Sequence, residues 1–187
     1  MHTKPILFSA PMVRAILDGR KTQTRRVIRP QPEHVEWFER QKGWCARVSP
    51  QQYEMVKAFA APGDILWVRE RFRIEQGSPC YFTACPCGLE GKHGEKGWKP
   101  SIHMPRWACR VWLEVIDVRV ERVREISGVD IQAEGLPVAF DVPGAFDALD
   151  RFADLWDSLN AKRGYSWASN PWVWRIEFRR CEKPEGF

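Results

Sequence analysis

The clearest pattern in the chain is an alternation of apolar and polar residues in its second half. Valine and leucine recur, mostly at every second position, from Val111 to Val123, with arginine and glutamate between them. Trp172 to Arg179 repeats the alternation with tryptophan, isoleucine and phenylalanine. Period-two alternation is typical of strands with one buried face. The apolar run from Ile65 to Phe72 follows the turn-forming sequence Pro62-Gly63-Asp64 and predicts a further strand.

Two later stretches have helical signals. Ser127-Gly128-Val129-Asp130 has the form of a capping box and predicts a short helix that extends to about Glu134. A long helix is predicted over residues 143–162, with Gly164 placed to end it. Its apolar residues recur at spacings of three and four and predict one stripe facing the core: Phe146, Leu149, Phe152, Trp156 and Leu159.

The beginning of the chain combines a helix, a turn and a strand. Residues 11–17 predict a short helix that Ser9 can cap and Gly19 can end. If Thr22 to Val27 is a strand, alternation places Thr22, Thr24 and Arg26 on one face. Lys21 then lies at the corner between helix and strand. A cation beside hydroxyl groups can activate a nucleophile or bind a phosphate, whereas the alternative is a solvated basic turn.

The order of these elements predicts the fold class. Helices do not alternate regularly with strands, so a parallel sheet is not expected. We predict an α+β fold, an antiparallel β-barrel with peripheral helices. The length of 187 residues indicates a single domain over 1–187. Residues 30–60 and 75–97 have mixed composition and are predicted to be insertions, the second of them a loop.

Charge and hydropathy narrow the cellular setting. The chain has 29 basic and 24 acidic residues, a net charge of +5, and ten tryptophans. Arg20, Lys21, Arg25, Arg26 and Arg29 fall in one short segment. This distribution favours a polyanionic partner, and tryptophan can stack on bases as well as fill a core. No apolar run approaches the ~18 residues of a membrane helix and no signal peptide is present, which predicts a cytoplasmic protein with no membrane partner and reduced thiols.

Two motifs resemble those of a known family. Lys4 to Phe8 followed by Gly19-Arg20-Lys21-Thr22-Gln23-Thr24-Arg25-Arg26, and later Pro62 to Glu70, are similar to the activating-signal-cointegrator homology (ASCH) family. The segments Trp98–Trp107 and Asn160–Tyr165 are similar to those of ASCH-like proteins of bacteriophages and prophages. The resemblance implies a PUA-like β-barrel associated with RNA or modified nucleosides.

The resemblance also implies a catalytic set. Some small ASCH proteins remove the acyl group from N4-acylated cytidines with a lysine, a threonine and a glutamate, which match Lys21, Thr24 and Glu134. A threonine hydroxyl needs a base to become a nucleophile, and lysine is a base only when burial or a nearby cation lowers its pKa from ~10.4. Glutamate can orient the lysine or protonate the leaving amine. The alternative is a structural salt bridge between Lys21 and Glu134.

Further residues are candidates for binding a nucleic acid or nucleotide. They are Arg20, Thr22, Arg25 and Arg26 of the first motif, Trp98, His103, Arg106 and Trp107, and Arg163 with Asn170. Aromatic faces can stack bases, arginine can contact phosphate, and an asparagine amide can read a base edge. For Trp98–Trp107 the alternative is a loop that caps the barrel. For Arg163 and Asn170 it is ordinary capping and turn chemistry.

The cysteine-rich segment is a candidate zinc site. Cys80, Cys85, Cys87 and His93 supply three sulfurs and an imidazole, which is a valid zinc set. Their spacing is not one of the established zinc patterns, and the alternative is a loop of reduced thiols. No cofactor is required by the other motifs. Three functions therefore compete: a hydrolase of modified nucleosides, a non-catalytic module for RNA, DNA or a modified base, and a phage scaffold for protein partners.

Overall fold

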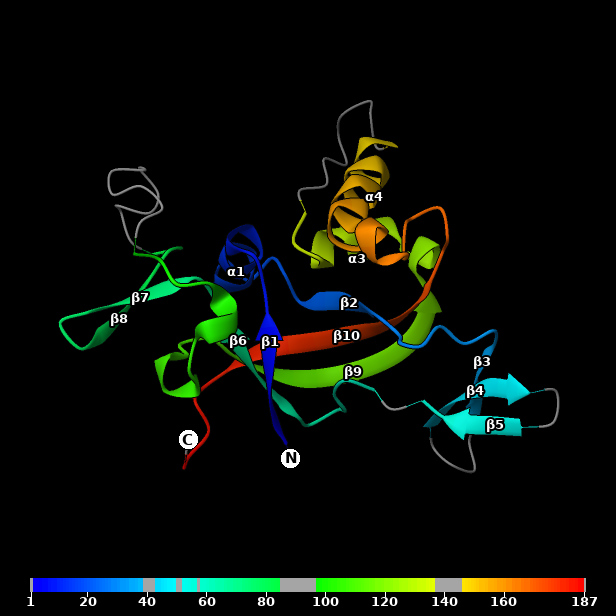
Figure 1. The fold of residues 1–187 in the computed structure, drawn as a ribbon, viewed down its shortest axis with the longest axis horizontal. Coiled ribbons are helices and arrows are strands. Elements are labelled where there is room, and N and C mark those ends of the chain that lie inside the picture. Colours follow the sequence, from blue (N-terminus) through cyan, green and yellow to red (C-terminus); the bar gives the residue numbers. More distant parts are fainter. Residues whose placement is uncertain are drawn as a thin grey trace. The chain divides into compact units, whose positions relative to one another are not determined.

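A computed structural model of the chain describes residues 2–38, 43–49, 52–56, 58–84, 97–136 and 146–186. The chain forms two compact units. The first comprises Met1–Thr22, Pro62–Ile116 and Phe178–Phe187, and the second comprises Gln23–Ala61 and Asp117–Glu177. Figure 1 shows the elements in sequence colours.

Five strands form the main sheet, in the order β1 (Thr3–Leu7), β6 (Ile65–Arg69), β9 (Trp112–Arg122), β10 (Trp172–Cys181) and β2 (Gln23–Val27). The three predicted strand stretches, 65–72, 110–123 and 172–179, correspond to β6, β9 and β10, although β10 continues to Cys181. The expected α+β class is confirmed. Alternation works here because each strand buries one row of side chains, such as Leu113 and Val115 in β9 and Ile176 and Phe178 in β10.

Two details of the sheet differ from the predicted antiparallel barrel. β1 pairs with β6 in parallel, with Thr3 opposite Ile65 and Leu7 opposite Arg69. A long crossover separates these strands in sequence, which is the condition under which parallel pairing becomes possible. In the described residues the strand order begins at β1 and ends at β2, so the sheet is not a closed barrel.

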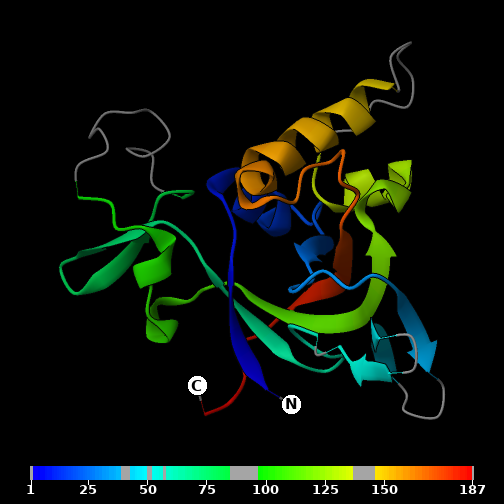
Figure 2. The same cartoon turned by 45° about the vertical axis from the view of Figure 1, so that its right-hand side comes forward.

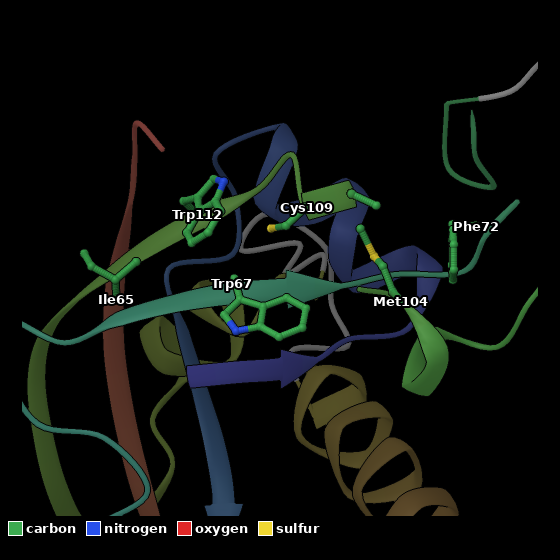
Figure 3. Packing of buried hydrophobic residues seen from close by; sticks show 7 residues of the cluster. Ile65, Trp67, Phe72, Met104, Cys109 and Trp112 are labelled. Atoms are coloured by element: carbon green, nitrogen blue, oxygen red, sulfur yellow. The ribbon is translucent and has the colours of Figure 1, made fainter. Parts of the chain in front are cut away.

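The first unit has a core on β6 and β9. Ile65, Trp67, Phe72, Met104, Ala108, Cys109 and Trp112 form one buried cluster, most of which is labelled in Figure 3. The helix α1 (Ala10–Leu17) follows Ser9, which occupies the cap position without a side-chain cap bond, and Gly19 has a φ of 75° at its end. Glycine is favoured there because a side chain rarely adopts positive φ.

The prediction of a loop over residues 75–97 is wrong at its beginning. β7 (Phe72–Glu75) and β8 (Ser78–Tyr81) form an antiparallel hairpin, visible beside its labels in Figure 1. Its turn residues, Gln76 and Gly77, have φ of 49° and 80°. Two successive positive φ angles suit the right-handed twist of a hairpin. Glutamine in place of the usual Asn or Asp hid the turn signal, and Pro79 weakened the strand pattern.

The second unit contains a sheet of its own and two helices. Residues 30–60, predicted as an insertion, hold the antiparallel strands β3 (Val35–Phe38), β4 (Gly43–Ser49) and β5 (Gln52–Met55). The helix α3 (Gly128–Ala133) begins after Ser127, and the predicted capping box is present. α3 and α4 (Phe146–Asn160) lie together in both ribbon views.

The expected apolar stripe of α4 is only partly a core. Phe152 and Trp156 are buried with Ile131 and Val173, whereas Leu149 and Leu159 are 40% and 58% exposed. The predicted helix was also longer, because 143–145 lie outside the described residues and residues 161–163 form a 3₁₀ turn before Gly164 at a φ of 85°. The buried face of α4 is therefore narrower than the apolar stripe that the sequence pattern predicts.

Candidate functional site

A buried arginine at the centre of the second unit organises the candidate site. Arg25 on β2 has a side chain that is 1% exposed, and three carboxylates surround it. Its Nε lies 2.6 Å from Glu121 Oε1, its Nη1 3.1 Å from Glu134 Oε1, and its Nη2 3.4 Å from Asp130 Oδ2. Arginine suits this position because its planar group presents five donors in fixed directions.

A second set of contacts attaches α3 to β2. Gln23 Nε2 donates to the Asp130 carbonyl and to Asp130 Oδ1, both at 2.9 Å. Arg175 of β10 donates to Gln23 Oε1 at 2.7 Å and pairs with Glu177. Arg175 and Arg25 lie opposite each other in the sheet register. The two strands therefore present one continuous polar face to α3, which contains Asp130 and has Glu134 as its C-cap residue.

The electrostatics of the carboxylates differ with their surroundings. Burial alone raises the pKa of Asp130, but hydrogen bonds from Gln23 and Ser127, with the charge of Arg25, outweigh it and lower the pKa to about 2. Burial raises the pKa of Glu121, and the charge and hydrogen bond of Arg25 oppose this only in part. Asp130 therefore stabilises the folded unit mainly as an anion.

The lowered pKa of Asp130 predicts a specific loss of stability in acid. Because the folded pKa is about 2 and the unfolded value is 3.8, the contribution is complete above pH ~4 and disappears as the pH falls through 2. Because solvent partly screens this carboxylate, we expect about 1 kcal/mol of unfolding free energy to be lost in this window. Urea titrations of wild type and Asp130→Asn should give curves that converge as the pH falls towards 2. A wild-type excess that stays constant from pH 6 to pH 2 would contradict the assignment.

Glu134 and Thr24 belong to the same unit, but they lie on different elements. Thr24 alternates with Gln23 and Arg25 along β2 and therefore points to the opposite face of the strand, opposite Ile176 of β10. Thr24 and Glu134 are 5% and 6% exposed. Burial lowers the pKa of Arg26, which shares the face of Thr24, and the charge of Glu134 opposes that shift. Glu134 thus acts on Arg25 and Arg26, on both faces of the sheet's last strand.

Lys21 and Arg20 belong to the first unit. Lys21 is 3% exposed, its backbone N–H donates to the Ala15 carbonyl at 2.9 Å, and its Nζ lies 5.5 Å from the centre of the Phe8 ring. A lysine is seldom buried to this degree. Arg20 is exposed and pairs with Asp18 at 2.8 Å, and Thr22 is exposed as well.

The other predicted binding residues fall into two groups. In the first unit Trp98 is buried, whereas His103, Arg106 and Trp107 are exposed. In the second unit Arg163 is exposed after α4. Asn170 has a φ of 45°, and its Oδ1 accepts the backbone N–H of Arg124 at 3.0 Å. The Asn170 amide oxygen therefore stabilises a turn, which was the alternative to recognition of a base edge.

Most of the zinc candidates lie outside the described residues. Cys85, Cys87 and His93 are in the undescribed segment, and Cys80 is on β8. In the part of the chain that the structure describes, no group of three or more His, Cys, Asp or Glu side chains is placed to hold a metal ion. Within the same part, no helix is long and apolar enough to cross a membrane.

Sequence reasoning missed several members of these networks. Gln23, Glu121, Asp130 and Arg175 were not singled out, although the four-residue spacing of Asp130 and Glu134 on a short helix was a signal. A second missed cluster lies in the first unit. Glu70, 1% exposed, accepts Arg110 Nε at 2.8 Å and the Thr83 hydroxyl at 2.5 Å. Nothing in the local pattern distinguishes these residues from solvated ones.

Neither a protein-family model nor a curated protein sequence matches the chain. Several solved structures are similar to it at low identity, and two of them are described here. One is an ASCH domain from Lactobacillus crispatus JV V101, with a TM-score of 0.43 and 12% identity, over 96% of this chain and 79% of that chain. The other is a protein from Enterococcus faecalis V583 described by the family DUF984, with a TM-score of 0.48 and 10% identity, over 100% of this chain and 84% of that chain. One of the two thus carries the name of the family whose motifs the sequence resembles.

Proposed function

We propose that this chain hydrolyses the N4-acyl group of a cytidine-type nucleoside, with Thr24 as nucleophile, Lys21 as base and Glu134 as the group that orients the reactants. The observation that carries the proposal is the fixed carboxylate of Glu134. Its Oε1 accepts Arg25 Nη1 at 3.1 Å, and its charge also acts on Arg26, the neighbour of Thr24 on the same strand face. The motif resemblance supplies the roles.

The ion pair with Arg25 favours an orienting role for Glu134 over a proton-donating one. Arg25 donates to this carboxylate, so Glu134 acts there as an acceptor. The proton of Thr24 then passes to Lys21 as the hydroxyl oxygen bonds to the acyl carbon. Lys21 returns that proton to the amine as the carbon–N4 bond breaks. Water finally cleaves the ester on Thr24, which releases a carboxylic acid and restores the hydroxyl.

A non-catalytic binding module is the second candidate. It is favoured by the ion pairs that hold the three carboxylates around Arg25, because carboxylates fixed in this way position acceptors without needing to move protons. A fixed carboxylate can accept the exocyclic amine of a base, as glutamate does with cytosine. According to this second candidate, the nucleoside binds near Glu134 and dissociates without chemical change.

A panel of acylated nucleosides separates the two candidates. N4-acylated cytidine, N4-acylated deoxycytidine and N6-acylated adenosine are incubated with the protein and the mixtures are separated by chromatography. The hydrolase proposal predicts free cytidine and an equimolar carboxylic acid from the cytidine substrate, and less product from the adenosine. Binding of the intact nucleoside in equilibrium dialysis with no product would establish the second candidate in its place.

A further inference from the structure

We propose that residues 97–107 of the first unit form a surface that binds single-stranded nucleic acid, with Trp107 as a stacking platform. This 97–107 surface is separate from the residues assigned to hydrolysis and does not depend on that proposal. Three independent properties of the segment lead to it: an exposed tryptophan, a rigid attachment to the sheet, and a local excess of positive charge.

Trp107 is exposed in a way that its neighbours are not. It is 60% exposed, whereas Trp98 and Trp112, on either side of it in sequence, are 7% and 3% exposed. Ile102, one short turn earlier, is 55% exposed. Large aromatic side chains are on average highly buried, so a tryptophan left mostly in water on an ordered segment indicates a contact surface.

The segment that carries Trp107 is firmly attached. Its two 3₁₀ turns are η1 (Ser101–His103) and η2 (Arg106–Ala108), and Met104 between them is 0% exposed, within the core cluster of Figure 3. Arg69 Nε donates to the Met104 carbonyl at 3.0 Å, and the Tyr81 hydroxyl donates to the Ala108 carbonyl at 2.8 Å. A platform held in this way loses little conformational entropy when it binds.

The beginning of the segment is attached as well. Lys99 and Phe72 exchange two backbone hydrogen bonds, of 2.7 and 3.3 Å, which join the segment to β7. The Trp98 ring lies with its centre 5.2 Å from that of Phe82 in an edge-on arrangement, and the Arg73 guanidinium lies 4.7 Å from the Trp98 ring centre. Trp98 therefore has a structural part in the surface, and Trp107 is the ring that remains open to a ligand.

The charge of the segment fits a polyanion. Lys99, His103 and Arg106 are exposed, and the sequence from Gly97 to Val111 contains no aspartate or glutamate. Exposed cations beside an aromatic face are the combination that binds single strands, because phosphates contact the cations while bases stack on the ring. A duplex hides its base faces, so the proposal commits to single strands.

The test of the stacking part uses a fluorescently labelled twelve-nucleotide single-stranded RNA and a duplex of the same sequence. Trp107→Ala is expected to weaken binding of the single strand roughly ten-fold or more, the usual scale for one stacked base, and Trp107→Phe to retain most of it. Leu159→Ala, which removes a comparably exposed apolar side chain in the second unit, is the matched control and should not change affinity. Equal losses in Trp107→Ala and Leu159→Ala, or a duplex bound more tightly than the single strand, would overturn the proposal.

The charge part is tested by salt dependence. Arg106→Ala is expected to reduce the slope of log affinity against log salt by roughly 0.7, the value for one phosphate contact to a single strand. Arg119→Ala removes an arginine that is 63% exposed and paired with Asp117 and should leave the slope unchanged. A slope that is the same in wild type and Arg106→Ala, or wild-type protein that binds no RNA even at low salt, contradicts the 97–107 surface. If the wild type binds no RNA at low salt, the exposed Trp107 and Ile102 would favour an apolar protein partner instead.

Discussion

Replacing Arg25 by methionine is expected to lower the free energy of unfolding by about 3–5 kcal/mol. The substitution keeps most of the buried apolar volume but removes a guanidinium group that pairs with Glu121, Asp130 and Glu134. Three carboxylates would then lie close together in a region where the arginine side chain is 1% exposed. Removing one partner of a buried ion pair is costly because the remaining charge has lost both its solvent and its counter-ion.

Urea denaturation of matched variants measures this effect. Arg119→Met breaks an exposed pair with Asp117 and should change stability by less than about 1 kcal/mol. The double variant Arg25→Met/Glu134→Gln should recover part of the loss, because it removes one of the unpaired charges. If Arg25→Met costs no more than Arg119→Met, the buried cluster does not hold the second unit together.

Loss of the Thr24 hydroxyl is expected to abolish turnover of N4-acylated cytidine while the protein stays folded. Thr24→Ala removes the proposed nucleophile, and Lys21→Ala removes its proposed base, so each should reduce the rate by at least ~1,000-fold. Thr24→Ser keeps a hydroxyl and should retain measurable activity. If the protein only binds the nucleoside, the same alanine variants should each reduce the binding free energy by roughly 1–3 kcal/mol. No turnover would then be observed in the wild type or in the variants.

Initial rates and thermal melting are measured side by side for these variants. Ser158→Ala provides the control for the chemistry of the substitution, since it removes a hydroxyl from the exposed face of α4. Normal melting combined with lost turnover supports the proposed roles. Full activity in Thr24→Ala, or in Lys21→Ala, would remove that residue from the catalytic set.

Local patterns predicted the elements that depend on local physics. β9 and β10 were predictable because one buried face imposes a period of two over ten or more residues. α3 was predictable because Ser127 and Asp130 satisfy each other's backbone N–H groups within four residues. In both cases the signal and its cause lie in the same stretch of sequence.

The contacts that define the candidate site could not be predicted in this way. Arg25 and Glu134 are 109 residues apart, and their pairing depends on where α3 meets β2. Their environment also depends on the register that puts Arg175 opposite Arg25. Thr24 and Arg25 alternate along β2 as predicted, whereas Thr22 lies before the strand begins. No local pattern indicates that Arg25 is buried among carboxylates. The sequence indicated Arg25 as a direct ligand contact. From its ion pairs we instead propose that Arg25 positions Glu134.

The α4 stripe and the β7–β8 hairpin show the limits of the patterns themselves. Spacings of three and four marked Leu149 and Leu159 as core, yet the buried cluster with Ile131 of α3 contains Phe152 and Trp156 and leaves both leucines exposed. The hairpin has a turn of Gln76 and Gly77 and a proline in its second strand, which are unfavourable local choices that pairing with β7 overrides.

A time course of cytidine release tests the central claim most directly. Wild-type protein and Thr24→Ala are each incubated with N4-acylated cytidine, and free cytidine is quantified by chromatography at intervals. The proposed function predicts release that continues for many turnovers with the wild type and stays at the uncatalysed rate with Thr24→Ala. Release at the uncatalysed rate by the wild type, from a preparation shown to be folded, would contradict it.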